Sequence, residues 1–289
     1  VLSFKKLGKN YLYLEEDNPD ASGFIHEDEA ALSFARAMSG NGITYNNAPS
    51  EGKVDLRAET DGLFMVDEQR LQGFNSRIGV ICASRPGYTV VKKGDILAGT
   101  RIIPLYISKS DLLKSLAEIG SQPLFRVEPL QNVRAGILVT GSEVYEGLVE
   151  DKYTRIIRDK IEKYGSTVVS SLITPDSAEK ISEGIKKLVD DGVDLIVTTA
   201  GLSVDPDDVT LEGIIQAGVT DILYSVPVLP GSMLLMGKTG ETRIVGVPAC
   251  GLYNDYFSFD LLLPRILAGL EITREDLSLL GSGGLLLGT

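Results

Sequence analysis

Apolar and polar residues alternate in two different ways along this chain, and the change falls near residue 130. From residue 135 onward, short runs of apolar, β-branched residues take turns with segments whose apolar residues recur at helical spacing. The pattern predicts strands over residues 135–139, 167–173 and 193–198, and helices over residues 153–164, 178–189 and 210–217. Such alternation is typical of a parallel sheet covered on both faces. The tail adds expected strands over residues 226–229, 233–236 and 243–247 and a largely apolar helix over residues 252–267.

The first 130 residues show no such regular alternation. Helices are expected over residues 27–38 and 111–119, and short β-like pieces separated by turns fill much of residues 54–107. Residues 122–132, which contain two prolines, are expected to form a linker. The pattern therefore predicts two domains. Residues 1–130 form a mixed α+β domain with a β-rich, barrel-like part, and residues 131–289 form an α/β domain with a three-layer, mostly parallel sheet.

Charge and composition restrict the class of partner. The 289-residue chain has a formal net charge of -12 and no run of Lys or Arg that could lie along a phosphate backbone, so nucleic acid is not an expected partner. Its longest apolar runs fall short of the roughly 20 residues needed to cross a bilayer, and no basic-then-apolar leader is present. We therefore expect a cytoplasmic protein without membrane association. The chain opens on Val1 and enters predicted structure almost at once, which leaves open a natural segment before it.

The sequence contains a single histidine, which restricts the kinds of active site and metal site that the chain could form. His26 stands in a polar helix start, and a Ser-His-Asp triad, a Cys-His pair or a multi-histidine metal site would all need this one residue. We therefore do not expect an active site or metal site of these kinds. Cys82 and Cys250 are far apart in the sequence and are expected to be small buried residues in a reducing compartment. What remains is carboxylate, hydroxyl and backbone chemistry, which suits Mg²⁺ and phosphoryl or nucleotidyl groups.

Polar residues gather after two of the predicted strands. Loop one comprises residues 140–144, followed by Gly147 and by Glu150 and Asp151 at the start of the next helix, and loop two comprises residues 198–210. The carboxyl ends of parallel strands can place such loops at one crevice. The adjacent Asp207 and Asp208 repel each other unless a cation or a shared proton intervenes, which favours a Mg²⁺ site. A helix cap and a simply solvated acid pair remain the structural alternatives.

Two further loops combine proline with glycine. Loop three, residues 228–233, contains Pro230, Gly231 and Ser232, and loop four, residues 245–251, contains Pro248. Proline fixes one turn rigidly, while glycine leaves another open to a ligand. If they lie on the same end of the sheet, these loops would close a pocket over a phosphate or a ring.

Together the four loops resemble the molybdopterin-binding domain shared by the MoaB/Mog and MoeA proteins of molybdenum cofactor biosynthesis. The resemblance covers about residues 134–270 and keeps the order and spacing of four motifs: Thr140-Gly-Ser-Glu with Asp151, Ala200-Gly-Leu-Ser-Val with Asp208 and Thr210, Pro230-Gly231, and Gly246-Val-Pro. This chain departs from the usual residues of the family at two places. Ala200 stands where the family usually has glycine, and Ser232-Met233 stands where the MoeA branch typically carries a lysine.

The resemblance implies a site for the pterin dithiolene, or for its adenylylated form, at the carboxyl end of the sheet. It implies Asp208 and Glu143 as catalytic acids and Asp207 and Asp208 as Mg²⁺ ligands. The cofactor-binding residues it implies are Thr140, Gly141, Ser142, Asp151, Gly201, Ser203, Thr210, Pro230, Gly231, Ser232 and Pro248.

The function implied is molybdopterin binding in molybdenum cofactor biosynthesis, with Mg²⁺-dependent nucleotidyl transfer from ATP, or molybdenum transfer, as the reaction. Whether the chain is an enzyme stays open. The alternatives are a non-catalytic carrier, chaperone or sensor of the cofactor with a molybdoenzyme or biosynthetic protein as partner, and a generic nucleotide-binding α/β protein. Because dimers and trimers are usual in the family, a homo-oligomer is expected.

Overall fold

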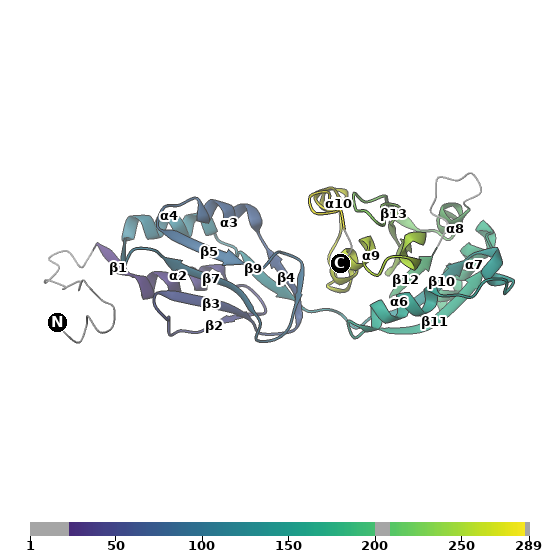
Figure 1. Ribbon diagram of the computed structural model, residues 1–289, viewed down its shortest axis with the longest axis horizontal. Helices are drawn as coiled ribbons and strands as arrows, with labels where there is room; N and C mark the ends of the chain where they lie inside the picture. Colours follow the sequence, from purple (N-terminus) through teal and green to yellow (C-terminus); the bar gives the residue numbers. More distant parts are fainter. Residues whose placement is uncertain (1–22, 200–208, 287–289) are drawn as a thin grey trace. The chain divides into compact units, whose positions relative to one another are not determined.

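The computed structural model describes residues 23–199 and 209–286. The chain divides into two compact units (Figure 1). The first comprises Val1–Thr60 and Phe64–Val127, and the second comprises Asp61–Leu63 and Glu128–Thr289. No helix among the described residues is both long enough and apolar enough to span a membrane.

The first unit is built from short strands and three helices among its described residues. In chain order the elements are β1 (Phe24–His26), α2 (Glu27–Met38), β2 (Ile43–Tyr45), β3 (Lys53–Ala58), β4 (Gly62–Val66), α3 (Glu68–Asn75), β5 (Val80–Ser84), β6 (Thr89–Val91), β7 (Ile96–Ile102), β8 (Tyr106–Ser108), α4 (Lys109–Ile119) and β9 (Phe125–Glu128). The strands fall into three sheets, ordered β1-β8, β2-β3-β7-β5 and β6-β4-β9. The sequence predicts a barrel-like part here, whereas the described strands form three separate sheets.

Helix α2 shows how local sequence fixes an element. Its first turn carries Glu27, Asp28 and Glu29, which suit the positive end of the helix dipole. The Nδ1 atom of His26 accepts a hydrogen bond from the Asp28 N–H at 3.2 Å and caps the helix. Phe34 and Met38, four residues apart, are fully buried in the core of this unit. The predicted bounds of this helix, residues 27–38, are confirmed.

Two features of this unit differ from the sequence analysis. The boundary between the two units falls within residues 122–132, between Val127 and Glu128, but these residues do not form a simple linker, because β9 lies within them and pairs in the β6-β4-β9 sheet with Phe125 and Val127 buried. Helix α3 was not expected. Only Phe74 of its eight residues is buried, so the segment has no apolar period to detect.

The second unit contains one six-stranded sheet among its described residues. Its elements are β10 (Arg134–Thr140), α5 (Ser142–Tyr145), α6 (Tyr153–Glu162), β11 (Thr167–Thr174), α7 (Ala178–Asp190), β12 (Leu195–Thr199), α8 (Thr210–Gln216), β13 (Thr220–Tyr224), β14 (Leu235–Thr239), β15 (Thr242–Val247), the 3₁₀ helix η1 (Ala249–Leu252), α9 (Ser258–Leu267) and α10 (Arg274–Leu279). The strand order is β11-β10-β12-β15-β14-β13.

This sheet is mixed. The neighbours from β11 to β15 run parallel, whereas β14 is antiparallel to β15 and β13 is antiparallel to β14. Residues 226–229, which were expected to form a strand, lie in a loop. The strand in this part of the chain is β13, at Thr220–Tyr224. Val226 and Val228 are apolar because they pack into the core from a loop that closes through a 2.8 Å bond from the Val226 N–H to the Ser232 carbonyl.

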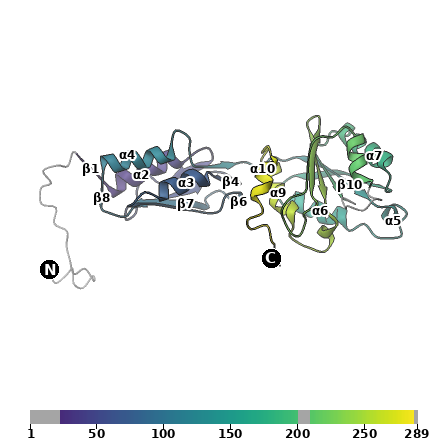
Figure 2. The same ribbon diagram turned by 90° about the horizontal axis from the view of Figure 1, so that it is seen from above.

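Successive residues of β10 point to different cores. Ile137 and Val139 pack in a cluster with residues of α6 and α9, whereas Leu138 packs in a cluster with residues of α7 and α8. This is the side-chain alternation expected of a strand buried on both faces. Helices α6 and α7 both pack against β10 and β11 (Figure 2). This packing of helices on the sheet fixes the positions of β10 and β11, and with them the loops that follow these strands.

Candidate functional site

The topology of the sheet brings the candidate loops to one end. Strands β11, β10, β12 and β15 are parallel and finish together, which defines the carboxyl end of the sheet. Loops one, two and four follow β10, β12 and β15. Loop three precedes β14, and because β14 is antiparallel and its Leu235 pairs with Gly246 near the end of β15, this loop also leads to the carboxyl end. Such an end is the usual ligand site of α/β sheets.

Part of loop two lies outside the described residues. Gly201, Ser203, Asp207 and Asp208 fall in residues 200–208. Thr210 is described, and it lies buried as the first residue of α8. Among residues 23–199 and 209–286, no three Asp, Glu, His or Cys side chains form a group able to hold a metal ion.

Loop one is tied to the neighbouring strands by its first two residues. The Thr140 hydroxyl donates to the Thr199 carbonyl at 2.8 Å, which joins the ends of β10 and β12. The Gly141 N–H donates to the Thr174 carbonyl at 3.1 Å, which joins the ends of β10 and β11. Gly141 has φ 148°, outside the region that other residues readily adopt. Both predicted residues therefore fix the position of the loop.

Ser142 has a partner that sequence reasoning missed. Its N–H donates to Oδ2 of Asp176 at 2.8 Å, and the Asp176 N–H donates to the Ser142 hydroxyl oxygen at 3.1 Å. The reciprocal pair joins loop one to the turn after β11. A signal was available, because Thr174-Pro-Asp-Ser repeats the pattern of a hydroxyl and an acid directly after a strand.

The two other acids of this region differ in their surroundings. Glu143 is exposed, and its backbone carbonyl accepts bonds from the Leu148 and Val149 N–H groups at 2.8 and 3.2 Å. The Asp151 carboxylate instead accepts bonds from the Thr154 N–H at 3.1 Å and the Thr154 hydroxyl at 2.5 Å, at the start of α6. Asp151 therefore helps begin this helix, as an N-terminal acid commonly does.

Loop three is packed against the start of α9. The Ser258 hydroxyl donates to the Gly231 carbonyl at 2.7 Å, and the Ser258 N–H donates to the Pro230 carbonyl at 3.2 Å. Gly231 has φ 110°, and a Cβ atom there would lie 2.9 Å from Ser258 Cβ. Glycine is thus required by close packing at this position. In loop four, Pro248 is buried and its carbonyl accepts a bond from the Gly251 N–H at 3.1 Å in η1.

Two buried hydroxyls mark the carboxyl end of the sheet. Thr199 at the end of β12 is 0% exposed and Thr174 at the end of β11 is 9% exposed. Neither Oγ1 atom has a hydrogen-bond partner among the described residues. A buried polar group left in this condition costs about 1–3 kcal/mol, so a ligand that satisfied it would recover part of that free energy.

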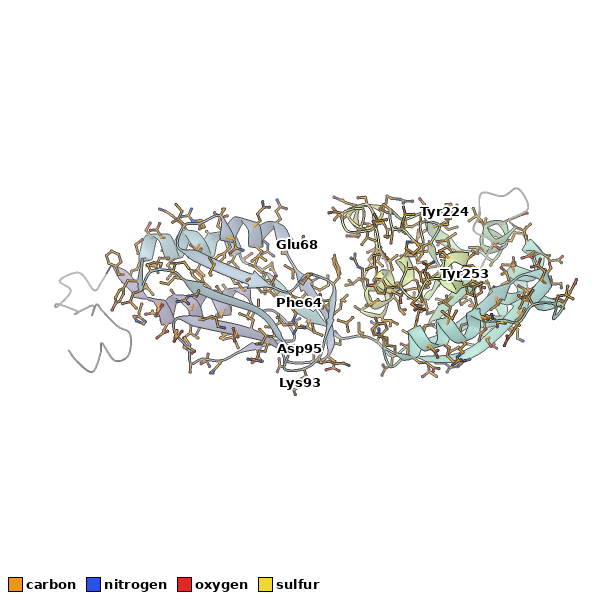
Figure 3. All side chains as sticks on the ribbon, viewed as in Figure 1. Phe64, Glu68, Lys93, Asp95, Tyr224 and Tyr253 are labelled. Carbon is orange, nitrogen blue, oxygen red and sulfur yellow. The ribbon has the colours of Figure 1, made fainter. Side chains whose placement is uncertain are left out.

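A third unpartnered hydroxyl lies beside loop four. The Tyr153 hydroxyl in α6 is buried and has no hydrogen-bond partner within the described part of the chain. Burial, and to a lesser extent the nearby Cys250 and Tyr253, raise the pKa of this phenol, so it stays protonated at neutral pH. Burial also raises the pKa of the Cys250 thiol. Tyr253 itself, which is labelled in Figure 3, is 85% exposed.

The comparison with known proteins identifies the domain. Residues 136–266 match the family described as a probable molybdopterin binding domain. Relatives named CinA-like protein are 41% identical over 81 residues in Mycobacterium avium and 37% identical over 81 residues in Mycobacterium tuberculosis. Each alignment covers 28% of this chain and 19% of the relative, so the chain spans about a fifth of the length of these relatives. Residues 136–266 of the second unit therefore match the molybdopterin-binding domain family, which confirms the resemblance seen in the loops.

Solved structures with a similar arrangement include two biosynthetic proteins. The molybdopterin biosynthesis enzyme MoaB from Thermus thermophilus is 22% identical, with a TM-score of 0.41 over 48% of this chain and 98% of its own. The molybdopterin biosynthesis MoeA protein from Pyrococcus horikosii is 15% identical, with a TM-score of 0.39 over 85% of this chain and 79% of its own.

Proposed function

We propose that this protein binds molybdopterin at the carboxyl end of the six-stranded sheet and acts in molybdenum cofactor biosynthesis. The observation that carries the proposal is the family match over residues 136–266, which includes all four loops that lead to this end. We further propose that the binding residues are those of loops one to four, with Asp176 added. The first unit would then be an accessory domain of a cytoplasmic homo-oligomer.

The described residues fit such a ligand in one respect. A pterin ring carries N–H and C=O groups, and the unpartnered hydroxyls of Thr174 and Thr199 can each donate one hydrogen bond and accept others. Carboxylates of Asp176 and Glu143 lie at or beside the same loops, so a ligand phosphate would meet like charge. Mg²⁺ with carboxylate ligands would neutralise that charge, and we propose Asp207 and Asp208 for this role.

Two versions of the function follow from the same site. In the first, Asp208 and Glu143 assist nucleotidyl transfer from ATP or molybdenum transfer to the bound pterin. In the second, the chain is a carrier, chaperone or sensor without catalysis. The hydrogen bonds from Thr154 to the Asp151 carboxylate and the internal bond made by Thr140 favour the second version, because these groups already serve the fold.

Ligand binding is tested by titrating the whole chain with purified molybdopterin in the presence of Mg²⁺. The wild-type chain should bind, and Thr199→Val should bind about 2- to 10-fold more weakly, the value of one neutral hydrogen bond. Thr242→Val is the matched control. Thr242 lies at the opposite end of the sheet, where its hydroxyl donates to the Val193 carbonyl at 2.9 Å, so affinity should not change. Absence of binding by the wild-type chain would contradict the proposal.

Catalysis is tested by incubating the chain with molybdopterin, ATP and Mg²⁺. Pyrophosphate release that Asp208→Asn abolishes, without loss of the folded state, would support the enzyme. Tight binding without pyrophosphate release or molybdenum insertion would support the carrier. Light scattering of the purified protein would measure its oligomeric state.

A further inference from the structure

The chain carries a segment beyond the family domain that contacts loop three. The family match ends at residue 266, whereas α10 and the residues after it extend the described chain to residue 286. We call residues 274–286 the C-terminal brace. Its position follows from side chains buried in the core on the α6 and α9 face of the sheet, where Leu277 is 1% and Leu280 is 9% exposed.

The brace satisfies both backbone polar groups of one residue in loop three. The Leu229 N–H donates to the Gly284 carbonyl at 2.8 Å, and the Leu286 N–H donates to the Leu229 carbonyl at 2.7 Å. Leu229 and Leu285 thus form a parallel β-bridge. The bridge lies directly before Pro230 and Gly231, which form part of the proposed ligand site.

A second contact fixes the chain just before loop three. The Arg274 guanidinium donates to the Ser225 carbonyl at 2.7 Å and to the Tyr224 carbonyl at 2.5 Å, at the end of β13. Ser225 has φ 65°, an uncommon conformation for a residue other than glycine. The brace therefore hydrogen-bonds to Tyr224 and Ser225, just before loop three, and to Leu229 within it. Ser258 of α9 hydrogen-bonds to Gly231, further along the same loop.

We infer that the C-terminal brace is a positioning element for ligand binding in this protein. It sets where Pro230, Gly231 and Ser232 stand at the carboxyl end of the sheet. The inference rests on the proposed function, because it concerns the same site. It adds a segment that lies outside residues 136–266 and that hydrogen-bonds to backbone groups of loop three and of the residues before it.

Two glycines of the brace provide a matched pair of variants. A Cβ atom at Gly284 would overlap the carbonyl oxygens of Pro227 and Leu280, so Gly284→Ala should displace the brace from Leu229. A Cβ atom at Gly281 would meet its nearest atoms at 3.5 to 3.7 Å, which is ordinary contact, so Gly281→Ala should leave the brace in place. Hydrogen exchange at the Leu229 and Leu286 amides reports directly whether the bridge has opened.

Molybdopterin titration of the full chain then tests the inference. Gly284→Ala should bind about tenfold more weakly, and Arg274→Gln, which removes an exposed anchor without a clash, should weaken binding about 2- to 5-fold. Gly281→Ala should bind as the wild type does. Ile185→Val, in the core on the α7 and α8 face, is a control for general loss of stability and should also keep its affinity.

The outcomes separate the two proposals. Unchanged affinity in Gly284→Ala and Arg274→Gln, with faster exchange at Leu229, would overturn the positioning role alone. Equal losses of affinity in Ile185→Val would also overturn it, because the brace would then act only through stability. Failure of the wild-type chain to bind would overturn the proposed function and this inference together.

Discussion

Threonine hydroxyls give the carboxyl end of the sheet its chemical character. Thr140 uses its hydroxyl to join two strand ends, while Thr174 and Thr199 bury theirs without a partner among the described residues. A protein gains nothing in stability from an unpaired buried hydroxyl, because the group loses its hydrogen bonds to water on folding. Such groups are therefore candidates for ligand contacts.

The first prediction concerns Thr174. Thr174→Val removes the unpaired hydroxyl and keeps the shape of the side chain, so the free energy of unfolding should stay the same or rise. Thr242→Val removes a hydroxyl that donates a buried bond to Val193, and it should cost about 1 kcal/mol. Chemical denaturation of both variants without ligand measures the difference. A clear loss of stability in Thr174→Val would show that this hydroxyl does have a partner.

Sequence reasoning at the residue scale found the right region but not all of the residues. It singled out Ser142 and Asp151 for their chemistry, and the structure shows Asp151 at the start of a helix. It did not find Asp176, because the contact between Ser142 and Asp176 spans 34 residues of sequence. Only the parallel pairing of β10 and β11 brings these two residues together.

At the scale of elements, one arginine joins two helices of the first unit. Arg70 of α3 donates from Nη1 to the carbonyls of Ile119 and Gln122, each at 2.6 Å, at and just beyond the end of α4. Its Nε donates to Oδ2 of Asp67 at 2.8 Å. The Arg70 backbone N–H also donates to the Asp67 carboxylate, and this bond is the main reason that the pKa of Asp67 lies below its usual value.

The second prediction follows from the sign of that shift. A carboxyl whose pKa is lowered by folding stabilises the folded state above its unfolded pKa, and this contribution is lost as the pH falls through the folded value. Asp67→Ala should therefore destabilise α3 relative to the wild type by about 1 kcal/mol at neutral pH. The difference should shrink below about pH 4.

Hydrogen exchange of peptides from α3 and α4, at neutral and acidic pH, measures this effect. Asp55 offers a matched control, because its carboxylate lies in the same unit, 3.0 Å from the Lys53 ammonium, but caps no helix. Asp55→Ala should leave the exchange of α3 unchanged. A difference between Asp67→Ala and the wild type that does not depend on pH would contradict the assigned role of the carboxylate.

At the scale of the whole molecule, the two units have separate cores among the described residues. The core of the first contains Phe34, Phe64 and Phe125, and the second has one core on each face of its sheet. A unit with its own core is expected to fold by itself. The family match, residues 136–266, falls within the second unit.

The third prediction is that residues 128–289, produced alone, fold and bind molybdopterin with an affinity within about threefold of the full chain. The control is residues 1–127 alone, which should fold without binding. Circular dichroism measures folding, and the same ligand titration measures affinity. A folded fragment of residues 128–289 that no longer binds would show that the first unit contributes to the site.

The sequence by itself determined α2 and α7, because burial of one helix face imposes a helical period on the chain. It also determined β10, because a strand buried on both faces reads as a continuous apolar run. It also determined which loops follow which strands. Tertiary structure alone decided that loop three leads to the same end of the sheet as the other loops, since this depends on the antiparallel pairing of Leu235 with Gly246.

It likewise decided the bond between Ser142 and Asp176 and the bridge between Leu229 and Leu285. The bridge joins residues far apart in sequence through backbone groups that every residue possesses, so no pattern of side chains could have revealed it. The Ser142–Asp176 pair uses the Ser142 hydroxyl and the Asp176 carboxylate, so the sequence offered these residue types, but only the pairing of β10 with β11 brings them together.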